Sequence, residues 1–199
     1  MFKKNLFCTI FFFTFVFSVW ADSTKSLAIF DFKINSQNDI SYMKKGLANL
    51  FSSRLSLPGK VILIDRTKIN KSLQNNKNLS EHEVILKTGF ETKADYILTG
   101  SVTEFAGAYS IDVKVFYIKN RSFLTFYDQA EKIDDIIEKT DIICAKINKK
   151  VFRRTTITFE KMKKEKVIDE VDLQRMHPEK MMPYQRQKDK KQKSWWKFW

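Results

Sequence analysis

Histidine and cysteine, the residues most typical of metal sites and of catalytic bases and nucleophiles, are few in this sequence and lie far apart. His82 and His177 are the two histidines, and neither has a second histidine or a cysteine within four residues to form a local metal site. Ser101 lies in the sequence Thr-Gly-Ser-Val, which lacks the Gly-x-Ser-x-Gly pattern of a hydrolase nucleophile. The sequence therefore predicts no catalytic residue, no metal ligand and no cofactor, and we expect a protein that is not an enzyme.

Two aspartates offer an alternative to this expectation. Asp31 and Asp65 both fall at the carboxyl end of a predicted strand, and open α/β sheets place their ligand crevices at that edge. A small-ligand-binding protein, or a hydrolase, could use these carboxylates. Acidic residues at strand ends also commonly cap the next segment, and Asp65 could form a local ion pair with Arg66.

The two cysteines cannot form a disulfide in a processed chain. Cys8 lies in the N-terminal apolar run, and Cys144 lies in a predicted helix. Because isoleucines surround Cys144 in the sequence, we expect it to be a small buried hydrophobic residue. A reactive thiol is the alternative.

Apolar periodicity predicts one α/β (α+β) domain that must position these residues. Strands are predicted at 27–32, 61–64 and 94–105, and in a hairpin at 109–130. A first helix is predicted to begin after an N-cap at Asn38 or Asp39 and to end at Pro58-Gly59, with its apolar stripe at 43–55. Further helices are predicted at 80–93 and 133–151, and a short one at 67–73 is an option. The predicted order is β-α-β-α-β-β-β-α over residues 27–154, in a single small mixed sheet.

Residues 94–105 form the centre of the predicted sheet. The run 96–98 fits a strand covered on both faces, whereas the alternation that follows fits a strand with one wet face. Gly100 lies between the two parts and marks a bend, a bulge or a close backbone approach. Earlier in the chain, Asn38 or Asp39 is the predicted N-cap of the first helix.

The order of these segments resembles a periplasmic α/β domain shared by the TolB N-terminal region, the curli-secretion CsgG-like proteins and the LpoB-type outer-membrane lipoproteins. The motifs that carry the resemblance are Ile64-Asp65-Arg66 and the run 94–102, Ala-Asp-Tyr-Ile-Leu-Thr-Gly-Ser-Val. The resemblance implies a function in the cell envelope that depends on protein–protein contact. The chain departs from the group because it lacks a lipobox cysteine, its hairpin is short and polar, and residues 155–199 follow where TolB carries a β-propeller.

The first 21 residues have the layout of a secretory signal peptide. Lys3 and Lys4 precede an apolar run at 6–19, and Val19-Trp20-Ala21 is a predicted cleavage site. We therefore expect residues 1–21 to be removed, residues 22–154 to form the domain, and the protein to be periplasmic. An uncleaved N-terminal anchor is the alternative.

Residues 155–199 are predicted to be a charged, largely extended or disordered tail, with an exposed helix or a linker over 159–173. The candidate contact residues near its end are Lys190, Lys191, Lys193, Trp195, Trp196, Lys197, Phe198 and Trp199. Each Lys or Arg near an anionic membrane contributes about 1 kcal/mol of binding, and Trp favours the headgroup region. A membrane surface, a partner protein and no defined role remain the alternatives for this segment, and nucleic acid is not expected.

These features together predict an exported, non-enzymatic cell-envelope protein that acts as a docking or assembly module. Its basic tail would tether it to a membrane surface or to an envelope partner. The expected docking surface is the unpaired strand edge of the hairpin at 109–130. The alternatives are a CsgG-like secretion-pore or ring subunit, which would form homo-oligomers, and the periplasmic small-ligand-binding protein described above.

Overall fold

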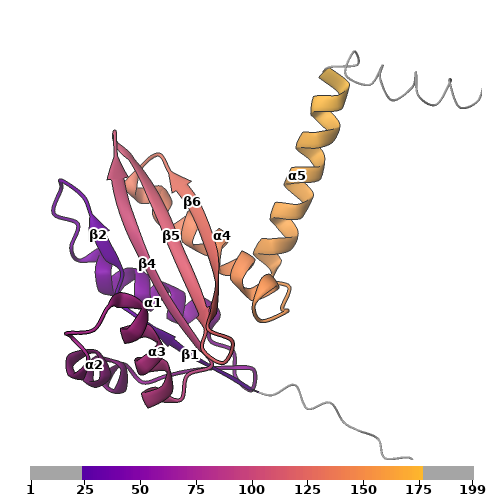
Figure 1. Ribbon diagram of the computed structural model, residues 1–199. Helices are drawn as coiled ribbons and strands as arrows, with labels where there is room; N and C mark the ends of the chain where they lie inside the picture. Colours follow the sequence, from indigo (N-terminus) through magenta and orange to yellow (C-terminus); the bar gives the residue numbers. More distant parts are fainter. Residues whose placement is uncertain (1–23, 177–199) are drawn as a thin grey trace, which may run out of the picture.

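A six-stranded mixed sheet with helices on both faces forms the domain in the computed structural model, which describes residues 24–176 and the side chains as far as residue 166 (Figure 1). The strands are β1 (Lys25–Ile29), β2 (Lys33–Asn35), β3 (Val61–Leu63), β4 (Tyr96–Phe105), β5 (Ala108–Tyr117) and β6 (Ser122–Ala130). The helices are α1 (Met43–Leu55), α2 (Arg66–Asn75), α3 (Glu81–Thr92), α4 (Ile136–Lys150) and α5 (Ile157–Met176). The predicted fold class, a small mixed-sheet α/β domain, is confirmed.

The strand order is β3-β1-β4-β5-β6, and β2 pairs with β4 beyond the end of β1. β1 runs parallel to β3 and β4, whereas β4, β5 and β6 form an antiparallel meander. The chain crosses from β1 to β3 through α1, and then back past β1 to β4 through α2 and α3. Crossovers between parallel strands keep one hand, so this reversal of direction places α1 on one face and α2 and α3 on the other.

Two apolar layers hold the helices to the sheet. The larger layer joins α1 and α4 to one face, where Leu98 and Val113 meet Phe51 and Ile143. The smaller layer joins α2 and α3 to part of the opposite face, as in the contact of Ile97 with their buried side chains. Successive residues of β4, such as Ile97 and Leu98, therefore pack in different layers, because side chains along a strand point alternately to opposite faces.

Gly100 lets the ring of Phe32 lie directly against β4. A Cβ atom at position 100 would fall 2.4 Å from Cε1 of Phe32 and 2.7 Å from the backbone oxygen of Asp112. The same ring stacks on Phe51 of α1, with 5.0 Å between the ring centroids. Of the three roles predicted for this glycine, the structure shows close approach.

The chain before α1 differs from the expectation in two ways. The strand expected at 27–32 ends at Ile29 in β1, and a short strand that the sequence did not predict, β2, begins at Lys33. Phe32, in the segment between the two strands, lies in the core. Helix α1 begins only at Met43 and has no side-chain cap. The two expected caps bind elsewhere: Asn38 donates to the carboxylate of Glu104 at 2.9 Å, and Asp39 accepts from the backbone N–H of Ser41 at 3.2 Å.

Residues 157–176 form helix α5, so this part of the segment that was expected to be largely extended or disordered is helical. It is the exposed helix that the sequence left as an alternative to a linker, and it projects away from the sheet (Figure 1). Its sequence is rich in helix-forming Glu, Lys and Met, and Glu160 and Lys164 are spaced for an i, i+4 pair. Within residues 24–176, no helix is both long and apolar enough to cross a membrane.

Replacing Gly100 by alanine should destabilise the domain by about 1–3 kcal/mol, because the new methyl group would overlap the ring of Phe32 and a backbone oxygen. Gly46 on the exposed side of α1 is a matched control, since nothing lies within 4 Å of a Cβ built there. Gly46→Ala should stabilise the domain by about 0.5–1 kcal/mol. Urea unfolding measures both effects, and equal effects of the two variants would contradict the close approach at Gly100.

Candidate docking surface

The aspartates at the strand ends make structural contacts. Asp65 is the N-cap of α2, and its carboxylate accepts from the backbone N–H groups of Thr67 at 2.8 Å and of Lys68 at 3.4 Å. Hydrogen bonds from the Thr67 side chain and backbone lower the pKa of Asp65. Asp31 forms an ion pair with Arg66, which replaces the local pair that we expected between Asp65 and Arg66. Both carboxylates of the ligand crevice predicted from the sequence are thus engaged within the fold.

The other residues that could do chemistry are also packed into the fold. Cys144 is buried among the apolar side chains under the sheet, and this burial raises the pKa of its thiol, as expected for a core residue. His82 packs near the ring of Phe116, with 6.3 Å between the ring centroids. Ser101 is half-buried on β4. In the part of the chain that the structure describes, no three His, Cys, Asp or Glu residues are grouped as metal ligands.

The predicted contact residues of the tail lie outside the described residues. They are Lys190, Lys191, Lys193, Trp195, Trp196, Lys197, Phe198 and Trp199. The tethering role of these residues therefore stays a prediction.

One half of the sheet is left open by α2 and α3. These helices cover the half around Ile97 and Phe116, and β4, β5 and β6 extend well past them (Figure 1). Because side chains alternate along a strand, the residues of the open half can be read from the strand register. They are Ser101, Thr103, Ser110, Asp112, Lys114, Thr125, Tyr127 and Gln129, all half-buried or exposed.

The outer edge of β6 has no strand beside it among residues 24–176. A groove of about 490 Å³ runs along this edge, between residues 125–129 of β6 and two lysines of α4, Lys146 and Lys150. We call it the β6 groove. Lys146 is paired with Asp128 at 3.0 Å, which fixes α4 against the strand, and Nζ of Lys150 lies 6.0 Å from the centroid of the Phe126 ring. The β6 groove thus combines free backbone groups with a cationic wall.

Exposed apolar side chains concentrate on β6 itself. Phe123, Leu124 and Tyr127 are 53%, 48% and 68% exposed. They point to both faces of the strand, so an element added beside β6 would contact apolar side chains on each face. The exposed hairpin edge that the sequence suggested as a docking surface is therefore present, on its second strand.

The α4 wall of the β6 groove was not recognised in the sequence. Lys146 and Lys150 are spaced i, i+4 and flank the buried stripe of Cys144 and Ile147, so they lie on one side of the helix. That spacing was visible in the sequence. What the sequence did not reveal is which strand lies next to that side of α4.

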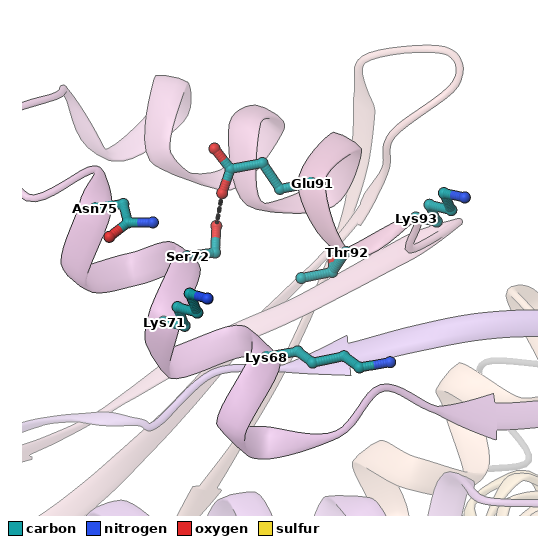
Figure 2. A pocket seen from close by; sticks show the side chains of 7 residues that line it. All are labelled: Lys68, Lys71, Ser72, Asn75, Glu91, Thr92 and Lys93. Carbon is teal, nitrogen blue, oxygen red and sulfur yellow. Dashed lines mark hydrogen bonds between the residues drawn. The ribbon is translucent and has the colours of Figure 1, made fainter.

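A second hollow, of about 430 Å³, lies between α2 and α3, and its lining residues are Lys68, Lys71, Ser72, Asn75, Glu91, Thr92 and Lys93 (Figure 2). Ser72 donates to the carboxylate of Glu91 at 2.5 Å, and Asn76 donates to the same carboxylate at 3.3 Å. These two hydrogen bonds lower the pKa of Glu91, with Ser72 the larger cause. The chief interaction in this hollow is thus a polar junction that ties α2 to α3.

The junction predicts a pH dependence of stability. Because the pKa of Glu91 is lowered in the folded state, the stability that its ionised form contributes is present above the ordinary value of 4.5 and is lost as the pH falls further. Glu91→Gln should therefore lower the urea midpoint at neutral pH, and the difference from the parent protein should shrink by about pH 3. An equal difference at both pH values would contradict the ionised junction.

Comparison with known proteins finds distant structural neighbours. No protein-family model matches the sequence, and no curated protein matches it. Among solved structures, the LpoB C-terminal domain from Salmonella enterica is 11% identical, with a TM-score of 0.43 over 57% of this chain and 87% of that chain. TolB from Acinetobacter baumannii is 15% identical, with a TM-score of 0.44 over 65% of this chain and 28% of that chain. A lipoprotein from Neisseria meningitidis is 12% identical, with a TM-score of 0.43 over 74% and 96% of the two chains.

LpoB and TolB are also named in the resemblance drawn from the sequence. Identities this low, with TM-scores below 0.5, leave the function to be argued from the residues of this chain.

Proposed function

We propose that this protein is an exported docking module that binds an extended segment of a partner protein along the edge of β6. The single observation that carries the proposal is the edge of β6, which has no strand beside it among residues 24–176, bears exposed apolar side chains and is flanked by the lysines of the β6 groove. In this mode a partner strand extends the sheet from five strands in the main ladder to six, and its backbone pairs with β6.

The chemistry of the β6 groove indicates what the partner segment carries. Backbone pairing supplies binding that does not depend on the partner's sequence, whereas the side chains beside the edge supply selectivity. Phe123 and Tyr127 on one face of β6, and Leu124 on the other, favour apolar residues in the partner strand. Lys150 favours an acidic residue facing α4, since its neighbour Lys146 is already paired with Asp128. The partner is thus an apolar strand with an acidic residue.

Export, envelope location and tethering are further parts of the proposal, and they rest on the sequence. Residues 1–21 provide the export signal, and the basic, Trp-rich end of the chain provides attraction to an anionic membrane surface or to the partner. The proposal includes no enzymatic activity. Asp65 and Asp31, the carboxylates that could otherwise bind a ligand, support this part of the proposal because they cap α2 and pair with Arg66.

A ring or pore subunit is the second candidate function, and the same free edge favours it. Two copies of β6 could pair edge to edge, or β6 could accept an edge of the next subunit in a ring. The two candidate functions predict different binding partners at β6. The docking module binds a different protein there, whereas the ring or pore subunit binds a second copy of this chain, so the mass of the bound partner distinguishes them.

A photo-crosslinking residue in β6 tests the proposal in the native host cells. Benzoylphenylalanine in place of Tyr127 should give a discrete, light-dependent adduct, because this side chain is exposed beside the β6 groove. Tyr42 is a matched control, since it is 70% exposed, is also a tyrosine and lies before α1. Adding Lys150→Glu to the Tyr127 probe should reduce the adduct by repelling an acidic partner.

The adduct mass separates the two candidates. An adduct of twice the chain mass would assign the edge to a second copy, and another mass would assign it to a different partner. Absence of an adduct at Tyr127, or the same adducts at Tyr42, would contradict docking at β6.

A further inference from the structure

A third hollow, of about 400 Å³, lies where β1, β3 and β4 begin, and it shares only Lys150 with the β6 groove. Its walls come from the starts of these strands, the end of β5 and the segment that follows α4. We call it the basal hollow. Its volume is within the range of small-molecule sites, about 300–1,000 Å³.

Three aromatic rings line the basal hollow. Tyr96 and Tyr117 stack with 5.0 Å between their ring centroids, and Phe152 meets Tyr96 edge-on at 5.5 Å. Burial is the main cause that raises the pKa of Tyr96, followed by Tyr117 and Asp95, so its hydroxyl stays protonated and can donate at neutral pH. The rings therefore offer an apolar wall, and Tyr96 adds a hydrogen-bond donor.

The charged side chains of the basal hollow are all cationic. Lys25, Lys60, Lys150 and Arg153 line it, and no acidic residue does. Nζ of Lys150 lies near the Phe126 ring, so this lysine contributes mainly its alkyl chain. The nearby carboxylate of Asp95 already accepts from the backbone N–H and the hydroxyl of Ser26, at 2.8 and 2.9 Å. Cationic side chains therefore outnumber acidic ones in the lining among the described residues, and Lys60 and Arg153 supply the positive charge on which the inference rests.

We propose that the basal hollow binds an organic phosphate, with the phosphate group against Lys60 and Arg153 and the apolar part against Tyr96, Tyr117 and Phe152. A guanidinium presents a planar set of donors that matches phosphate oxygens, and a lysine adds a point charge. The aromatic wall selects against inorganic phosphate, which has no apolar part to bury. The inference goes beyond the proposed docking function and does not depend on it.

The hollow between α2 and α3 fits such a ligand less well. It also contains three lysines, but the ionised carboxylate of Glu91 lies among them and would repel an anion. Its lining includes no aromatic side chain. The basal hollow is thus the better match of the two for a ligand that is both anionic and apolar.

Arg153 can be replaced by glycine without backbone strain, so this residue is well suited to a test of the inference. Its φ is 52°, in the left-handed region where glycine is the usual residue after a helix. Arg121, in the turn between β5 and β6, has the same φ and does not line the basal hollow. Arg153→Gly and Arg121→Gly therefore remove the same charge from positions with the same positive φ, and neither is expected to disturb folding.

The experiment is a calorimetric titration of the full chain with phenyl phosphate, and separately with dihexanoyl phosphatidylglycerol below its micelle concentration. The first probe represents a soluble phosphate and the second a lipid headgroup, without a bilayer that could attract the tail. We expect saturable binding that Arg153→Gly weakens about tenfold or more and that Arg121→Gly leaves unchanged. Unfolding midpoints of both variants provide the check on folding.

The two probes distinguish the sources of the phosphate. Arg153-dependent binding of phenyl phosphate supports a soluble ligand, and Arg153-dependent binding of the lipid alone supports a headgroup. No saturable binding of either probe, or an equal loss in the two glycine variants, would overturn the inference. None of these outcomes bears on the β6 groove, because neither arginine lines it.

Discussion

The length of β4 relative to its parallel neighbours determines the surface of this protein. β4 is ten residues long, whereas β1 has five and β2 has three. Helices α2 and α3 pack on the half of the sheet around Ile97 and Phe116, near the short parallel strands, and they leave the far half of β4, β5 and β6 open (Figure 1). Within residues 24–176 no further strand follows β6, so the meander ends there in a strand with a free edge.

Packing on the opposite face makes this arrangement possible. There α1 and α4 run beneath the long strands and bury one face of the meander, including Phe126 and Ala130 of β6. The ring of Phe32 fills the space that Gly100 leaves beside β4, and this contact joins the parallel and antiparallel parts of the sheet. Because one face of β6 is fixed in this way, its edge is held in a strand conformation before any partner arrives. A preorganised edge lowers the ordering cost of docking.

Local patterns in the sequence were sufficient to predict most of the fold. Apolar runs and the Ser80–Glu83 capping box, which the structure shows in full, located most of the strands and helices. Positions determined by distant contacts were harder to predict. Asn38 looked like a helix cap but binds Glu104, 66 residues away, and Arg66 pairs with Asp31 rather than with its neighbour. The basal hollow is another such case, because Lys60, Tyr96 and Arg153 come together only through the sheet and α4.

The central claim is that the chain acts outside the cytoplasm by docking to another protein through its sheet. Fractionation of the native host cells, with salt and detergent washes followed by size and intact-mass analysis, tests it most directly. The account predicts a mature chain without residues 1–21, located in the envelope, released by high salt and eluting together with a second protein. A monomeric chain in the cytoplasm that retains residues 1–21 would contradict the account.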